Sequence, residues 1–127
     1  MILIDDFNIN EDSIAILKKY RTYLLTEKHL SDNSISSYIL DVYKYLKYLK
    51  EKKVYYPITI SKENIINYLE YLDNNKYSIY SIVRKISSLR TFHHYLSKIY
   101  NIKDVMLDID NPRFYKKIPN VLSIEEV

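Results

Sequence analysis

The sequence predicts an all-α protein. Apolar residues recur at spacings of three and four in four stretches, and this spacing gives a helix one buried face. Ser or Asp stands at the expected start of three of these stretches, where its side chain can accept from the free N–H groups of the first turn. The 127 residues suffice for one domain with a sizeable core. We therefore expect four helices, with a short fifth turn near residues 104–107.

The helices are expected at residues 13–28, 33–52, 62–72 and 78–100. Asp12 and Ser61 are the expected caps of the first and third helices, and Ser31-Asp32-Asn33 opens the second. Residues 54–60 contain Pro57 and form a connection, briefly extended, between the second and third helices. Glycine is absent, so Asn and Asp, for instance in Asp73-Asn74-Asn75, are expected to take the left-handed conformation in turns.

The fourth stretch has the composition of a surface that meets a polyanion. Its apolar side is formed by Ile79, Ile82, Val83, Ile86, Leu89 and Leu96. The opposite side collects Tyr80, Ser81, Arg84, Ser88, Thr91 and Tyr95, flanked by Lys85 and Ser87. No Asp or Glu occurs between Lys76 and Asp104. Hydroxyls and cations without acids can approach phosphates and donate to them, so we interpret this stretch as a DNA-contacting helix.

The second stretch repeats the pattern. Its buried stripe is Ile35, Tyr38, Ile39, Val42, Tyr45, Leu46 and Leu49. Its outer side holds Asn33, Ser36, Ser37, Leu40, Lys44 and Lys47. The third stretch is mildly acidic, with Glu63 and Glu70. If the two basic helices lie side by side, their cations neutralise phosphates and make the affinity salt-dependent. The alternative is that these cations are only solvated surface.

Composition excludes several classes of function. Without glycine, the phosphate-binding loops GxxxxGK and GxGxxG are absent. Without cysteine there is no disulfide framework or thiolate chemistry, which fits a cytoplasmic protein. No hydrophobic run approaches the length of a membrane span, so no membrane partner is expected. The three histidines lack further ligands at suitable spacing, and we expect no metal or other cofactor.

The end of the chain resembles the opening of another domain. We divide the sequence into an N-terminal arm (1–11), a helical DNA-binding domain (12–109), a basic linker with prolines (110–122) and the start of a truncated domain (123–127). The last segment contains Ser123-x-x-Glu126, a capping box that begins a helix.

Three stretches match known motifs in the same order. LSDNSISSYILD, at residues 30–41, follows the pattern L-S-x-N-T-x-x-x-Y-x-x-D-L. RKISSLRTFHHYL, at residues 84–96, follows R-R/K-L-S-A-L-R-x-F-Y-x-Y-L. Residues 110–113 and 118–127 follow x-x-P-K and L-P-K-V-L-S-x-E-E-V, although Asn120 replaces the usual Lys. Residues 13–127 thus resemble the core-binding domain of Xer-type tyrosine recombinases and phage-type integrases, with its linker and its entry to the catalytic domain.

The resemblance implies an orthogonal, SAM-like bundle of four or five helices that forms half of a clamp around double-stranded DNA. The other half would carry the catalytic groups and a nucleophilic Tyr that forms a 3′-phosphotyrosine link without a cofactor. Full-length protomers would then exchange strands as a tetramer, in DNA integration or chromosome dimer resolution. The catalytic HxxR motif is absent here, because Asp32, Leu96 and Ser97 stand three places after the histidines. We therefore expect this chain to bind DNA without being catalytic itself.

The candidate DNA contacts are Asn33, Ser36, Ser37, Lys44, Lys47, Ser81, Arg84, Lys85, Ser87, Ser88, Arg90 and Thr91. Arg90 lies near the buried stripe, where a structural bond is the alternative, and Asn33 could instead help to cap its helix. Two other functions stay open. A helical protein-interaction module predicts exposed apolar residues on this face, and a helix-turn-helix transcriptional regulator gives the basic linker no purpose.

Overall fold

The computed structural model describes residues 4–109. They form the helices α1 (Glu11–Thr26), α2 (Asp32–Glu51), α3 (Lys62–Asn74) and α4 (Ile79–Tyr100), with the short 3-10 helices η1 (Ile4–Asp6), η2 (Pro57–Thr59) and η3 (Val105–Asp108). The all-α prediction and the four predicted helices are confirmed, and residues 4–109 contain no strand. The predicted linker and the opening of a further domain lie outside the described residues.

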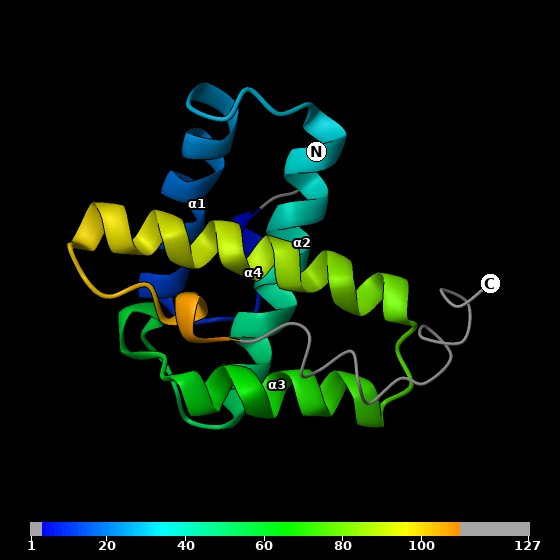
Figure 1. The fold of residues 1–127 in the computed structure, drawn as a ribbon. Coiled ribbons are helices and arrows are strands. Elements are labelled where there is room, and N and C mark those ends of the chain that lie inside the picture. Colours follow the sequence, from blue (N-terminus) through cyan, green and yellow to red (C-terminus); the bar gives the residue numbers. More distant parts are fainter. Residues whose placement is uncertain (1–3, 110–127) are drawn as a thin grey trace.

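Helices α2 and α4 form the centre of the bundle, because each of them contacts the other three α-helices. In Figure 1, α1 and α2 stand upright beside each other, α4 crosses them at a steep angle, and α3 lies at the foot of α2. The crossing of α2 and α4 brings together the two helices that carry most of the candidate DNA contacts. The two basic helices therefore lie in contact, which is the arrangement considered from the sequence for a shared DNA-binding surface.

Tyrosines provide several of the largest side chains of the core. Tyr20, Tyr45, Tyr68 and Phe92 are among the largest fully buried side chains. Tyr20 packs edge-on against Phe92, with ring centroids 5.1 Å apart, and Tyr45 lies 5.0 Å from Tyr68. Such aromatic pairs add about 0.5–1.5 kcal/mol to the free energy gained from burial alone. Many of the 15 tyrosines thus have a structural role.

Serine caps start three of the helices. The side chains of Ser31, Ser61 and Ser78 accept from the N–H groups three residues onward, at the starts of α2, α3 and α4. The expected cap of α1 is wrong: α1 starts at Glu11, and Asn10 occupies the N-cap position instead of Asp12. Asp12 lies in the first turn, where its charge still favours the positive end of the helix dipole.

Left-handed residues end the helices, but mostly not the expected ones. Positive φ angles occur at His29, Lys53, Lys76 and Asn101. The prediction for residues 73–75 is wrong, because α3 runs to Asn74 and the reversal falls two residues later. The N–H of Val54 donates to the Leu49 carbonyl over 2.8 Å, a closure that requires the left-handed residue between them. The position at which a helix ends therefore determines which residue takes the left-handed conformation, whatever the type of that residue.

The N-terminal segment packs onto the bundle. Ile4 and Ile9 are buried in the common core, and the Phe7 ring stacks on Tyr43 with centroids 4.0 Å apart. Residues 4–10 of the predicted arm therefore pack against the helical bundle. The connection at residues 54–60 forms η2 where an extended segment was expected.

Candidate nucleic-acid interface

A single buried carboxylate joins α2 to α4. Asp41, on α2, is 2% exposed. Its Oδ1 accepts from Arg84 Nη2 over 2.9 Å and from Lys85 Nζ over 3.3 Å, and its Oδ2 accepts from Ser88 Oγ over 2.8 Å. All three donors come from α4. Charge-assisted bonds to a desolvated carboxylate are among the stronger polar contacts in proteins, so this cluster fixes how the helices cross.

The two cations of the cluster have different surroundings. The Lys85 side chain is 3% exposed, and burial lowers the pKa of its ammonium group against the opposing effect of Asp41. The Arg84 side chain is 55% exposed although its guanidinium reaches the same carboxylate. Asp41 therefore neutralises one buried cation and leaves Arg84 at the surface as the cluster's accessible positive charge.

The expectation that Lys85 and Ser88 belong to the exposed face of α4 is wrong. Both are buried, as is Tyr95, which was placed on the same side. The reason is that α2 covers the side of α4 that carries Lys85 and Ser88, while Tyr95 packs against Tyr20 and Tyr23 of α1. The exposed arc of α4 is therefore narrower than the sequence predicts, and it is displaced away from α2 relative to the predicted arc.

The remaining candidates form a basic face, which we define as Asn33, Ser36, Ser37, Lys44 and Lys47 of α2 with Ser81, Arg84, Ser87 and Thr91 of α4. Asn33, Lys44, Lys47, Arg84 and Ser87 are exposed, and the other four are half-buried. Lys44 lies close enough to Lys85 to lower the pKa of that ammonium group. Asp41 is the sole acid in residues 33–50 and 79–100, and it is buried. These two helical segments therefore present cations and hydroxyls without an exposed carboxylate.

Arg90 has a structural role. Its Nη1 donates to the Met106 carbonyl over 3.3 Å and its Nη2 to the Ile109 carbonyl over 3.4 Å. These bonds hold η3 and the following Ile109 against α4. Of the two interpretations that the sequence left open for Arg90, the geometry supports the structural one.

A groove of about 470 Å³ runs beside the basic face, between α1 and the start of α2. Asp32, Asn33 and Ser36 line it on the α2 side, and Arg21 and Thr22 line it on the α1 side. Asn33 is not the cap of α2, because Ser31 has that position, so its amide is exposed beside the groove. This hollow extends the polar surface from the helix crossing toward α1.

The comparisons with known proteins agree with this architecture. Residues 17–98 match the family described as the phage integrase N-terminal SAM-like domain. The chain belongs to this family. No solved structure matches it.

Two curated relatives of the chain are both called tyrosine recombinase XerD. The protein of Staphylococcus haemolyticus (strain JCSC1435) is 37% identical over 114 residues, which are 89% of this chain and 39% of the relative. That of Rickettsia bellii (strain RML369-C) is 35% identical over 115 residues, 90% of this chain and 37% of the relative. The chain therefore spans about two-fifths of the length of these relatives.

Sequence reasoning missed two polar contacts inside this SAM-like domain. The sequence patterns indicate neither the donors that Asp41 binds nor the partner of His93. The Tyr45 hydroxyl and His93 Nε2 lie 2.9 Å apart in the core, and burial lowers the pKa of His93 to about 4. A lone acid beside the apolar stripe of α2 was the available signal for the first contact. The pairing of Tyr45 with His93 depends on how the helices cross, which local spacing does not reveal.

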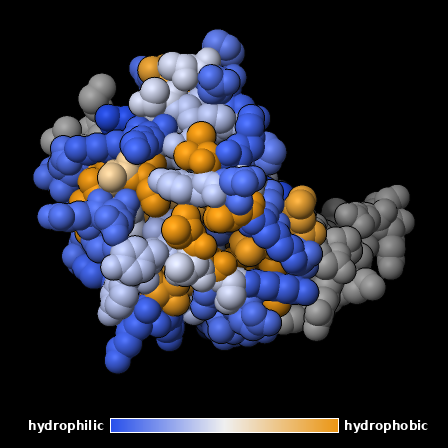
Figure 2. All heavy atoms as spheres, turned by 90° about the vertical axis from the view of Figure 1, so that its left-hand side faces the viewer, coloured by the Kyte–Doolittle hydropathy of each residue, from blue (hydrophilic) through white to orange (hydrophobic). Residues whose placement is uncertain are grey.

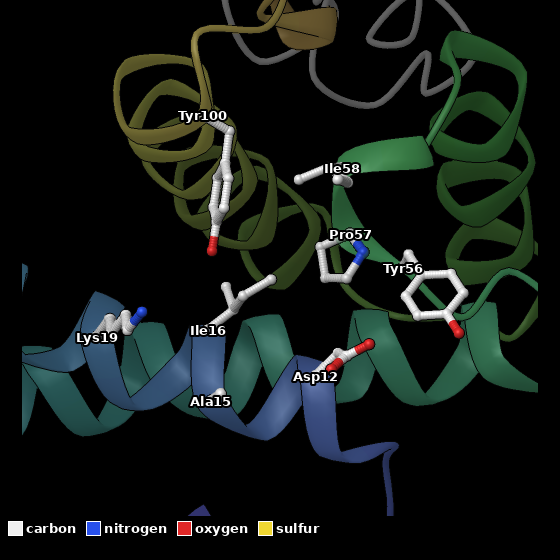
Figure 3. Close-up of a pocket in the computed structure, with 8 residues that line it drawn as sticks. All are labelled: Asp12, Ala15, Ile16, Lys19, Tyr56, Pro57, Ile58 and Tyr100. Carbon is white, nitrogen blue, oxygen red and sulfur yellow. The ribbon is translucent and has the colours of Figure 1, made fainter.

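A second hollow lies away from the basic face. It has a volume of about 240 Å³ and is lined by residues of α1, η2 and the end of α4, among them Ile16, Ile58 and Tyr100 (Figure 3). On the molecular face shown in Figure 2, apolar groups lie among hydrophilic ones. Residues 4–109 contain no cluster of side chains able to hold a metal ion and no helix suited to cross a membrane.

Proposed function

We propose that this chain is the DNA-binding half of a site-specific tyrosine recombinase, and that α2 and α4 hold duplex DNA through the basic face. The observation that carries this proposal is the charge pattern at the helix crossing. Across residues 33–50 and 79–100, Asp41 is the sole acid, and it is buried beneath Arg84. The exposed carboxylates of α2, Asp32 and Glu51, stand at its two ends, and the cation-bearing surface between them attracts a polyanion over several ångströms.

Arg84, Lys44 and Lys47 are the proposed phosphate contacts, because they are the exposed cations of the face. Ser87 and the other hydroxyls are small enough for the helix backbone to approach the duplex and can donate to phosphate oxygens. Asn33, at the exposed start of α2, is suited to pair with a base edge in the major groove. Phosphate contacts would provide most of the affinity, and base contacts would provide the sequence preference.

In this proposal the chain forms one side of a clamp, and a further domain supplies the other side together with the catalytic residues. The motifs at residues 110–127 support that arrangement, because they resemble the linker and the entry to such a domain. The full protein would act in the cytoplasm as a tetramer on DNA, in integration or chromosome dimer resolution. The chain alone would bind without cutting, and more weakly than the whole clamp.

The protein-interaction alternative predicts a stripe of exposed apolar residues where the cations lie. Tyr80 is 83% exposed and Leu40 is 39% exposed, and both are near the basic face. Two such side chains, one on each helix, are few for an interface core, which is normally contiguous and depleted of charge. Apolar contact with the methyl groups of thymine would accommodate them equally well.

The test compares two alanine variants of the 127-residue chain. Arg84→Ala removes an exposed cation from the basic face, and Lys19→Ala removes one from α1, beside the hollow of Figure 3. We expect Arg84→Ala to weaken binding to a labelled duplex about 10- to 100-fold, since a charged hydrogen bond contributes about 1.5–3 kcal/mol. Lys19→Ala should change it less than two-fold. Equal losses in the two variants would show attraction by net charge alone and would contradict the proposed face.

A further inference from the structure

Arg84 is held from beneath while most of its side chain faces solvent. Its guanidinium has five N–H donors in a rigid fork, and the bond to Asp41 uses one of the Nη2 hydrogens. An unrestrained arginine at a surface samples many rotamers, which must be ordered when it binds a phosphate. The buried carboxylate restricts that freedom before any ligand arrives.

We propose that Asp41 is a positioning residue for DNA binding, which anchors the Arg84 guanidinium at the α2–α4 crossing so that its remaining N–H groups are ready for a phosphate. The inference rests on the proposed function, because it assumes that the basic face meets DNA. It assigns a buried acid to the binding machinery of a face whose exposed charged members are cations. The opposite expectation treats Asp41 as a charge that repels phosphates.

The rest of the cluster explains how a carboxylate can have this role without cancelling the face. Lys85 Nζ, itself buried, lies 3.3 Å from Asp41 and offsets its charge. Ser88 Oγ donates a hydrogen bond to Asp41 Oδ2, and this bond orients the carboxylate so that Oδ1 faces Arg84 and Lys85. The net charge of Asp41, Lys85 and Arg84 together is one positive charge, located on the exposed member. The phosphate therefore meets a fixed cation and no uncompensated acid.

The test replaces the buried pair while keeping the net charge. Asp41→Leu alone would leave Lys85 buried without a partner, which is strongly destabilising. Asp41→Leu/Lys85→Met removes one charge of each sign, and apolar residues of similar volume often replace a buried ion pair without loss of stability. The buried Ser88 hydroxyl, which loses its bond to Asp41, can donate to a backbone carbonyl one turn earlier in α4. Urea unfolding of each variant confirms the fold. The double substitution is made in the wild-type and in the Arg84→Ala background, which gives a double-mutant cycle for duplex binding.

We expect the double substitution to weaken duplex binding about 2- to 10-fold in the Arg84 background, which corresponds to immobilising one long side chain on binding. In the Arg84→Ala background it should have no effect, because no guanidinium remains to be positioned. Equal weakening in both backgrounds would mean that Asp41 only maintains the helix crossing. Tighter binding would mean that it only repels phosphates, and either result overturns the inference.

A measurement without DNA separates this inference from the proposed function. The ¹⁵N relaxation of Arg84 Nε, assigned by its loss in Arg84→Lys, should show a restricted side chain in the wild-type protein and a mobile one in Asp41→Leu/Lys85→Met. An equally mobile Arg84 in both proteins refutes the tether even if the protein binds DNA. A restricted Arg84 in a wild-type protein that fails to bind duplex at low salt rejects the proposed function, and the role of Asp41 in DNA binding with it.

Discussion

The buried pair of Tyr45 and His93 makes a prediction about stability in acid. His93 is 4% exposed and hydrogen-bonded to Tyr45, and burial lowers the pKa of its ring to about 4 from the usual 6.5. In the unfolded chain the ring regains the ordinary pKa. Between these two values the unfolded state binds a proton that the folded state does not, so the free energy of unfolding falls as the pH is lowered through this window.

The size of the effect follows from the shift. One pKa unit corresponds to about 1.4 kcal/mol, so a change from 6.5 to about 4 removes about 3 kcal/mol between pH 7 and pH 4. That is a large fraction of the stability of a typical small domain, about 5–15 kcal/mol. Above pH 7 the ring is neutral in both states and contributes no slope.

The assay is urea unfolding at several pH values between 7 and 4. The matched control is Tyr45→Phe/His93→Leu, which removes both polar atoms of the pair and leaves every other titrating group in place. We expect the wild-type protein to lose about 3 kcal/mol more than this control over the pH range. Parallel pH profiles for the two proteins would refute the reasoning, because they would show that His93 takes up its proton equally well in both states.

Three further predictions concern the core, a helix end and the basic face. Leu89→Ala, at a fully buried position of α4, should lower the free energy of unfolding by about 2–5 kcal/mol in urea, and a loss well under 1 kcal/mol would contradict its burial. Lys53→Gly, at the left-handed end of α2, should raise it by about 1 kcal/mol, since only glycine takes this conformation without strain; a loss of stability would contradict that φ angle. Lys44→Ala should make the log–log slope of duplex affinity against salt shallower by about 0.9, and an unchanged slope would remove Lys44 from the phosphate contacts.

The helices were predictable because their signals are local. Apolar spacing and the caps Ser31 and Ser61 placed α2 and α3 within one or two residues. The exposed arc of α4 was harder, because apolar spacing shows where the buried stripe is centred but not how far the neighbouring helices extend it. Lys85 and Ser88 are polar and nevertheless buried, since Asp41 of α2 offers them partners. That pairing joins residues more than forty positions apart, and no local pattern reports it.

The basic face retains the three exposed cations of α2 and α4 that were predicted from the sequence. Arg84, Lys44 and Lys47 are all accessible, whereas Arg90 is bonded to the backbone near η3. Family membership could also be inferred from sequence, because the motifs at residues 30–41 and 84–96 follow the family's patterns. The first motif spans the start of α2, and the second lies within α4. Part of each motif is structural: the Asp of the first holds the Arg and Lys that begin the second.

The central claim, that the basic face binds duplex DNA, is tested most directly by titrating the 127-residue chain into a labelled duplex at several salt concentrations. Each neutralised phosphate contributes about 0.9 to the slope of log affinity against log salt, so contacts from Arg84, Lys44 and Lys47 predict a slope of about −2.7. Binding with that slope, made shallower by Arg84→Ala, would support the account. A salt-independent affinity, or none at low salt, would contradict it.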